Sequence, residues 1–307
     1  MHFVPCVLFG ACVYALIRSG SFSGRGDWGV VLPSDWRGVA GALLIVGSGS
    51  VLLGMLLYPF QVRAVRVLEG YWDRWPVTAR LAGVLTEVQR RRICALGDRI
   101  VVGSDASSQE SRVAADAARR LAAVPPEEVL LPTALGNALR AGEFSAGERY
   151  GLATLASWPR IHMQVSDRLA GALYSARSAL DTAVNLCWSF LASAAVASGA
   201  LYDEPGMFWL PLMALLLAAL AYKGAVTAAQ AYAGLMHIVY DLHRFDLLDA
   251  LHHPLPERAD EAETFWQVSQ SFVGRPSADL PYDHGRHPRT SRRRSSGTRD
   301  AHGSADT

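Results

Sequence analysis

The residues best suited to chemistry stand near the end of the last long apolar segment. His237, Asp241, His243 and Arg244 lie close together in the chain, and more polar residues follow: Asp246, Asp249, His252 and His253. His237 and Asp241 are four positions apart, so on a helix they share one face. An imidazole and a carboxylate at this spacing fit two ligands of one metal ion. A polar helix end, with ion pairs such as Asp241 with Arg244, explains the same residues more simply.

Patterns that define catalytic or nucleotide sites do not accompany this group. No HExxH, GxSxG or Walker A pattern occurs. The glycines and serines from Gly47 to Ser50 lie inside an apolar run and indicate helix packing. The four cysteines are far apart and give no CxxC spacing. We therefore predict no cofactor and no metal, and an enzyme is not the favoured class.

A second group of candidate residues lies between positions 131 and 160. Thr133 is suited to cap a helix that Gly142 ends. Beyond it, charged and aromatic side chains alternate in a way that fits a surface for a protein partner. These residues are Glu148, Arg149, Tyr150, Trp158 and Arg160. An ion network at a helix corner, which would include Glu143, explains the same residues more simply.

Four apolar runs must position these groups, and they predict membrane-spanning helices. A hydrocarbon core about 30 Å thick requires roughly 20 helical residues. Residues 38–62, 182–202 and 205–222 come close to this length without a charged side chain. Residues 3–17 form a shorter run. We interpret it as a short span rather than a signal peptide, because no basic segment precedes it.

The spans divide the chain into four parts. Residues 1–62 carry two spans and their connecting loop, and residues 63–181 form a helical domain. Residues 182–251 form two spans as a long hairpin with an extension, and residues 252–307 form a tail that is disordered from about residue 273. The predicted fold class is all-α, a polytopic membrane protein with about four transmembrane helices and an inserted helical cytoplasmic domain.

The distribution of basic residues predicts the orientation. The connection 203–206 has two acids and no basic residue, whereas arginines and Lys223 flank the opposite ends of the spans. The positive-inside rule then places the central domain in the cytoplasm. With four spans, both termini are cytoplasmic too, in a multi-pass protein of the cell membrane. The three arginines of residues 18–37 oppose this assignment.

Several motifs resemble a family of multi-span membrane proteins of actinobacteria. The likeness covers roughly residues 60–256. The motifs that carry it are EGYW at 69–72, LPTALGNALRAGE with ERYG and WPRI at 131–161, and YDLHRFDLLDALHHPLP at 240–256. The resemblance implies a membrane protein with several spans. It implies no activity, cofactor or catalytic residue.

Three functions agree with these patterns. We favour a non-enzymatic scaffold or sensor whose cytoplasmic domain binds a protein partner, because that domain is large and lacks catalytic spacing. A homo-oligomeric channel or transporter is the alternative, since small residues recur one turn apart at Ser50 and Gly54. A membrane metal protein or enzyme is the third. The expected partners are the lipid bilayer and a protein or a second copy of the chain. Nucleic acid is not expected, because no aromatic residues alternate with the arginines at 90–92.

Overall fold

The computed structural model describes residues 3–73, 75–101, 107–275 and 280–282, and all regular structure within them is helical. The α-helices are α1 (Phe3–Ser19), α2 (Trp36–Leu57), α3 (Gln61–Glu69), α4 (Pro76–Asp98), α5 (Ser108–Ala122), α6 (Ala134–Ala146), α7 (Thr154–Ile161), α8 (Asp167–Ala200), α9 (Trp209–Ala250) and α10 (Glu261–Phe272). Short 3-10 turns join them: η1 (Trp28–Val30), η2 (Tyr58–Phe60), η3 (Glu127–Val129), η4 (Glu148–Tyr150), η5 (His162–Gln164) and η6 (Pro205–Met207).

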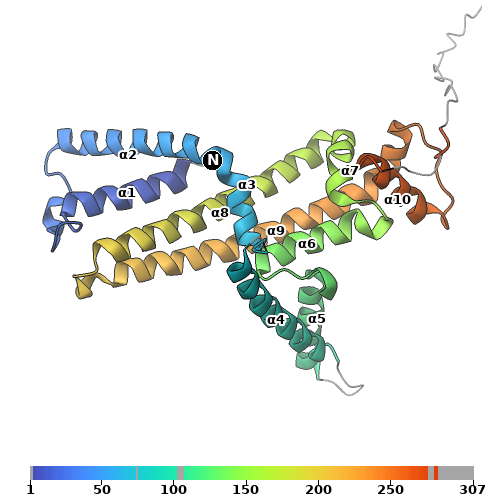
Figure 1. Cartoon of the computed structure of the whole chain (residues 1–307), viewed down its shortest axis with the longest axis horizontal. Helices are drawn as coiled ribbons and strands as arrows, with labels where there is room; N and C mark the ends of the chain where they lie inside the picture. The colour runs from blue at the N-terminus through green and yellow to red at the C-terminus, as the bar shows by residue number, and fades with distance from the viewer. Residues whose placement is uncertain (1–2, 74, 102–106, 276–279, 283–307) are drawn as a thin grey trace, which may run out of the picture.

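The antiparallel pair α8 and α9 forms the central rod of the molecule (Figure 1). The helices have 34 and 42 residues, which corresponds to about 51 and 63 Å. Both exceed a hydrocarbon core of about 30 Å, so each extends well beyond one. Helices α1 and α2 lie along one half of the rod, and α6, α7 and α10 lie along the other (Figure 1). Helices α8 and α9 form one long hairpin, joined through η6.

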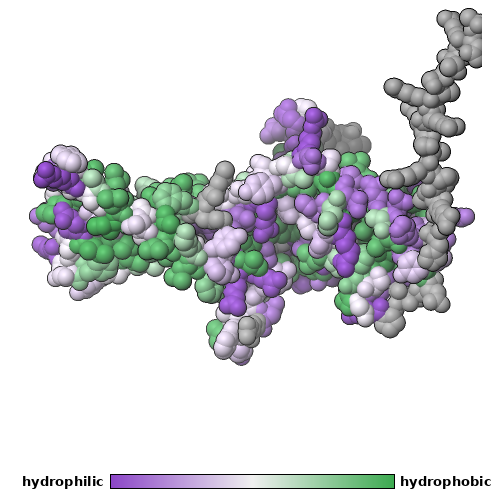
Figure 2. Space-filling view, turned by 90° about the horizontal axis from the view of Figure 1, so that it is seen from above, coloured by the Kyte–Doolittle hydropathy of each residue, from purple (hydrophilic) through white to green (hydrophobic). Residues whose placement is uncertain are grey.

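Three helical segments of the described residues are long and apolar enough to cross a membrane: Trp36–Glu69, Asp167–Ala200 and Pro205–Ala250. The apolar helix α1, with 17 residues, is shorter than these. Figure 2 shows an apolar surface over the half of the rod that carries α1 and α2, with polar residues at its tip. Leu44 and Met55 of α2, for example, are 72% and 70% exposed. Such a surface is expected against lipid and is costly in water.

A bend after α2 directs the chain across the rod. Pro59 lies in η2, and α3 follows as an amphipathic helix, with Val65 buried and Arg63 and Arg66 exposed. Gly70 ends α3 with φ +96°, a conformation that favours glycine. The carbonyl of Glu69 accepts a hydrogen bond from Thr133 Oγ1 at 2.7 Å. The end of α3 is thereby fastened to the start of α6.

Helix α6 packs closely on α9. Thr133 caps α6 as predicted, because its Oγ1 accepts from Gly136 N at 3.0 Å. The prediction that Gly142 ends this helix is wrong, since α6 continues to Ala146. A Cβ at Gly142 would clash with Cβ of Ala233 on α9. Gly142 therefore allows two helices to approach each other rather than terminating one.

Helices α4 and α5 form a separate hairpin that points away from the rod (Figure 1). Helix α5 begins with a capping box, in which Ser107 and Glu110 satisfy each other's main-chain N–H groups. Pro125 and Pro126 follow the end of α5, where proline cannot continue a helix. The hairpin connects α3 to the segment before α6.

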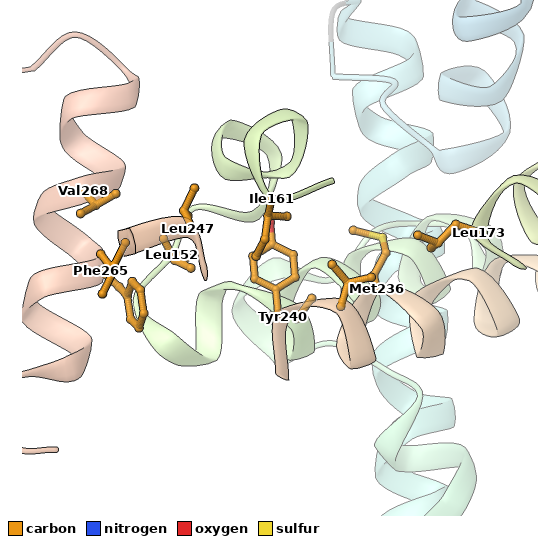
Figure 3. Packing of buried hydrophobic residues seen from close by; sticks show 11 residues of the cluster. Leu152, Ile161, Leu173, Met236, Tyr240, Leu247, Phe265 and Val268 are labelled. Carbon is orange, nitrogen blue, oxygen red and sulfur yellow. The ribbon is translucent and has the colours of Figure 1, made fainter. Parts of the chain in front are cut away.

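The largest buried cluster lies at the end of the rod opposite α2. It joins α7, the outer part of α9 and α10, and it contains Leu152, Ile161, Tyr240, Leu247 and Phe265, all at most 1% exposed (Figure 3). We call the part formed by α6, η4, α7, the outer half of α9 and α10 the distal body. Helix α10 lies in the first part of the predicted tail, before residue 273. The predicted disorder concerns mainly residues 276–279 and 283–307, which lie outside the described residues.

Candidate functional site

The two groups of candidate residues, about 90 positions apart in the chain, meet in the distal body. The hydroxyl of Tyr150 in η4 donates a hydrogen bond to Asp241 Oδ1 on α9 at 2.6 Å. The guanidinium of Arg149 forms an ion pair with the same carboxylate. Gly151 follows η4 with φ +86°, which lets the chain turn directly after these residues. The Asp241 carboxylate therefore interacts with both Arg149 and Tyr150, and it links the two groups of candidate residues.

His237 lies one turn before Asp241 and contacts two acceptors. Its Nδ1 is 3.1 Å from the carbonyl oxygen of Ser145, and its Nε2 is 3.4 Å from Asp241 Oδ2. A carbonyl oxygen can only accept, so Nδ1 carries a proton. Nε2 then donates to Asp241 only when the imidazole is protonated.

Arg244 has different partners from those predicted. Its Nε pairs with Glu261 Oε1 of α10 at 2.8 Å, and an Nη donates to the main-chain carbonyl of Asp241 at 2.6 Å. The predicted ion pair between Asp241 and Arg244 is therefore wrong. The reason is tertiary, because α10 supplies one carboxylate to Arg244 and η4 supplies the cation for Asp241. The Arg244 guanidinium also lies 4.3 Å from the ring centre of Tyr150, in a cation–π contact.

The remaining candidates have internal partners of their own. His243 Nδ1 lies 2.8 Å from Asp246 Oδ2. Glu148 pairs with Arg140 at 3.0 Å, and Arg140 also pairs with Glu143 at 2.8 Å, which forms an ion network at the corner between α6 and η4.

Trp158 and Arg160 instead make aromatic contacts inside the distal body. Trp158 stacks on Tyr240 with ring centres 6.2 Å apart. Arg160 lies 4.0 Å from the ring centre of Phe272, at the end of α10. The residues predicted as one partner surface thus belong to several contacts between helices.

Tyr240 is a residue that the sequence analysis did not select. It is fully buried, its hydroxyl donates to the carbonyl of Thr154 at 2.9 Å, and it lies 2.8 Å from Ser157 Oγ. The outer half of α9 extends beyond a bilayer-length span, and here burial in the protein raises the pKa of Tyr240 to about 12. Tyr240 is four residues from Met236 and seven from Leu247, so the sequence could have indicated that all three share the buried face of α9.

The cluster around Asp241 is suited to fastening helices together. Two carboxylates, Asp241 and Glu261, face two guanidiniums, Arg149 and Arg244, so its charges balance. Within the described residues, no three His, Cys, Asp or Glu side chains are grouped so that they would hold a metal ion. The interactions in this cluster are ion pairs and hydrogen bonds that join η4, α9 and α10.

A different kind of candidate surface lies on α4. Four aliphatic side chains follow one another at helical spacing, and all are exposed: Val77 (77%), Leu81 (51%), Val84 (63%) and Val88 (38%). We call these four residues the α4 stripe. Successive members are three or four positions apart, so they form one face of the helix. Ala82, on another face, is the buried residue of α4.

The comparisons with known proteins give no further assignment. No family model, no curated protein and no solved structure matches the chain.

Proposed function

We propose that this chain is a membrane-anchored scaffold that uses the hairpin of α4 and α5 to bind a protein partner. The α4 stripe is the observation that carries the proposal. It extends over about 16 Å of helix at 1.5 Å per residue, and its four side chains are left uncovered by the rest of the chain that the structure describes. An amphipathic helix that presents such a row of anchors is a common element of peptide and protein recognition.

The charges around the α4 stripe favour an acidic partner. Helix α4 carries four arginines and two acids. Glu87 is engaged by Arg90 and Arg91, whereas Arg80 and Arg92 form no ion pair with another described residue. An apolar row flanked by free guanidiniums fits an amphipathic helix with carboxylates beside its apolar face.

The proposed topology has four spans, with α1 as the shortest. Its 17 residues correspond to about 26 Å, slightly less than a hydrocarbon core, and it packs along α2 and α8. Four spans leave both termini on the side of the distal body. The acidic connection at 203–206 and the arginines after α2 support a cytoplasmic location for that side, in a cell membrane.

Photo-crosslinking in living cells tests the scaffold proposal. A photoreactive amino acid replaces Val84 in the α4 stripe and, in a matched variant, replaces the exposed Cys94, which lies off the stripe on the same helix. We expect one defined protein adduct from position 84 and a much weaker one from position 94. The double substitution of Leu81 and Val84 by Glu, read with a crosslinker at Val77, should remove that adduct.

Three results would overturn the proposal. Equal labelling at positions 84 and 94 would show that the α4 stripe is not a specific surface. Adducts that contain only a second copy of the chain would indicate self-association. Adducts that contain only lipid would place α4 on the membrane surface instead.

A further inference from the structure

A cavity of about 460 Å³ lies in the apolar half of the molecule, away from both the distal body and the α4 stripe. Its walls come from the start of α1, the end of α2, the start of α3 and the middle of α8. Leu57, Tyr58 and Phe60 line it and are 49%, 67% and 50% exposed, so the cavity opens on the outer surface. Its volume is within the range of about 300–1,000 Å³ that is usual for small-molecule sites.

The lining is apolar at depth and carries one charge. Cys6, Phe9, Leu53 and Ala192 are among the apolar wall residues, and Arg63 is the charged one. No aspartate or glutamate of the part of the chain that the structure describes lines the cavity. Arg63 is exposed, and it forms no ion pair with another described residue. Its guanidinium lies 6.0 Å from the ring centre of Phe60, which also lines the cavity. The cavity therefore combines apolar walls with a guanidinium that is not paired with a carboxylate.

The position of Arg63 in the chain indicates what kind of ligand the cavity can bind. It is the first charged residue after the charge-free run of residues 38–62, so it stands where the span that includes α2 leaves the hydrocarbon. Tyr58 and Trp188 line the cavity near the same level, and such aromatic residues are enriched where hydrocarbon meets headgroups. At this depth an acyl chain is the available apolar occupant, and a lipid phosphate is the available anion.

We propose that this cavity binds a membrane phospholipid with an anionic headgroup, with one acyl chain between α1, α2 and α8 and the phosphate paired with Arg63. The complementary charge favours a phospholipid over a second copy of the chain. The apolar surface of α2 beside the cavity, with Leu56 67% exposed, lets the second acyl chain remain in the bilayer. The inference rests on the membrane spans and not on the protein partner proposed for α4.

Native mass spectrometry of the full chain tests the headgroup contact. The protein is taken from mixed micelles that contain equal amounts of phosphatidylglycerol and phosphatidylcholine, and the retained lipids are counted. We expect one retained lipid with a preference for phosphatidylglycerol. Arg63→Gln should reduce that preference about fivefold, the effect of one surface charge. Arg66→Gln is the matched control, because Arg66 is exposed on the same helix but does not line the cavity.

Filling the cavity tests the acyl-chain contact. Ala192→Phe should remove the retained lipid of either headgroup, whereas Ala195→Phe, at an exposed position outside the cavity on the same helix, should not. Helicity by circular dichroism shows whether each variant folds. If Ala192→Phe does not fold, the comparison of Arg63→Gln with Arg66→Gln decides alone.

Several outcomes would overturn the inference. These are the absence of a retained lipid, equal losses for Arg63→Gln and Arg66→Gln, or wild-type lipid retention in a folded Ala192→Phe variant. A dimer in place of the lipid adduct, dispersed by Ala192→Phe, would show that a second copy covers the cavity. Each readout is independent of crosslinking at α4, so failure of the partner proposal would leave this result intact.

Discussion

The distal body and the hairpin of α4 and α5 are both helical and carry many charged residues, yet they use their apolar residues in opposite ways. In the distal body, Leu152, Tyr240 and Phe265 are completely buried. In α4, the aliphatic residues Val77 and Val84 are more than 60% exposed, and Ala82 is the buried one. Burial of apolar surface thus stabilises the distal body. The hairpin leaves apolar surface exposed, where it can contact another molecule.

Polar side chains differ between the two regions as well. In the distal body they join segments that are distant in sequence, as Tyr150 joins Asp241 and Arg244 joins Glu261. In the hairpin most ion pairs are local, such as Arg120 with Asp116 at i,i+4. Exposed local pairs contribute little to stability, about 0.3–0.5 kcal/mol each. The difference predicts how each region responds to substitution.

The largest expected effect comes from removing a core side chain of the distal body. Phe265→Ala should lower the free energy of unfolding by about 3–5 kcal/mol, because it leaves a cavity where α10 packs on α9. Thermal unfolding in lipid nanodiscs measures the loss. The neighbouring Trp266 is 52% exposed, so Trp266→Ala should cost clearly less. Equal losses for the two variants would contradict the packing described here.

Replacing a glycine by alanine should change the free energy of unfolding in opposite directions in the two regions. Gly142→Ala forces α6 away from Ala233 and should cost about 1–3 kcal/mol of unfolding free energy. Gly83→Ala on α4 meets no atom within 4 Å, and it should stabilise that helix by about 0.5–1 kcal/mol. Hydrogen exchange of α6 and α4 separates the two effects. If both substitutions stabilised or both destabilised their helices, the proposed difference between the two regions would be wrong.

The buried hydroxyl of Tyr240 predicts a loss of stability in alkali. Its pKa is about 12 in the folded chain and about 10 in an unfolded one. The contribution of the neutral hydroxyl to the free energy of unfolding is therefore complete below pH 10. It is lost as the pH rises through 12. The difference corresponds to about 2–3 kcal/mol.

The control for this prediction is a second tyrosine. Between pH 10 and 12, unfolding free energies should fall less for Tyr240→Phe than for the parent chain. Tyr174 is 78% exposed, so Tyr174→Phe should keep the steep decline of the parent. A parent chain with a flat profile would show that Tyr240 is not held as described.

The smallest effect on stability is expected in the α4 stripe. Substitution of both Leu81 and Val84 by Glu should change the unfolding free energy of the distal body by no more than about 0.5 kcal/mol per site, because both side chains are exposed. The matched change Val239→Glu, at a fully buried position of α9, should prevent folding of the distal body. Comparable losses in the two variants would show that α4 is structural.

The long rod could be predicted because it depends on local properties. Charge-free length and the lack of proline after Pro211 determine α8 and α9 without knowledge of their partners. Thr133 was predictable for the same reason, since an N-cap acts within its own helix. The first apolar run was harder, because the helix that contains it, α1, has 17 residues and is close to the lower limit of a span.

The partners of the candidate residues could not be predicted from the sequence. Asp241 and Arg244 have compatible spacing, but the packing of η4 and α10 decides which charges they meet. Gly142 has the residue type of a helix end, and only the approach of α9 shows that it serves packing. Tertiary contacts overrode local signals at these positions, while those signals were correct for the rod.

The length of α9 also sets distances from the bilayer. The charge-free run predicts that the span of α9 ends at Lys223. From there to Asp241 the helix rises about 27 Å at 1.5 Å per residue, which would place the cluster around Asp241 well clear of the headgroups. Helix α4 begins at Pro76, only a short helix and a turn after the charge-free run ends at Val62. A molecule bound to α4 would therefore occupy the narrow zone next to the membrane, where bulky domains are sterically excluded. The rod thus acts as a spacer that holds two layers of the protein at different heights.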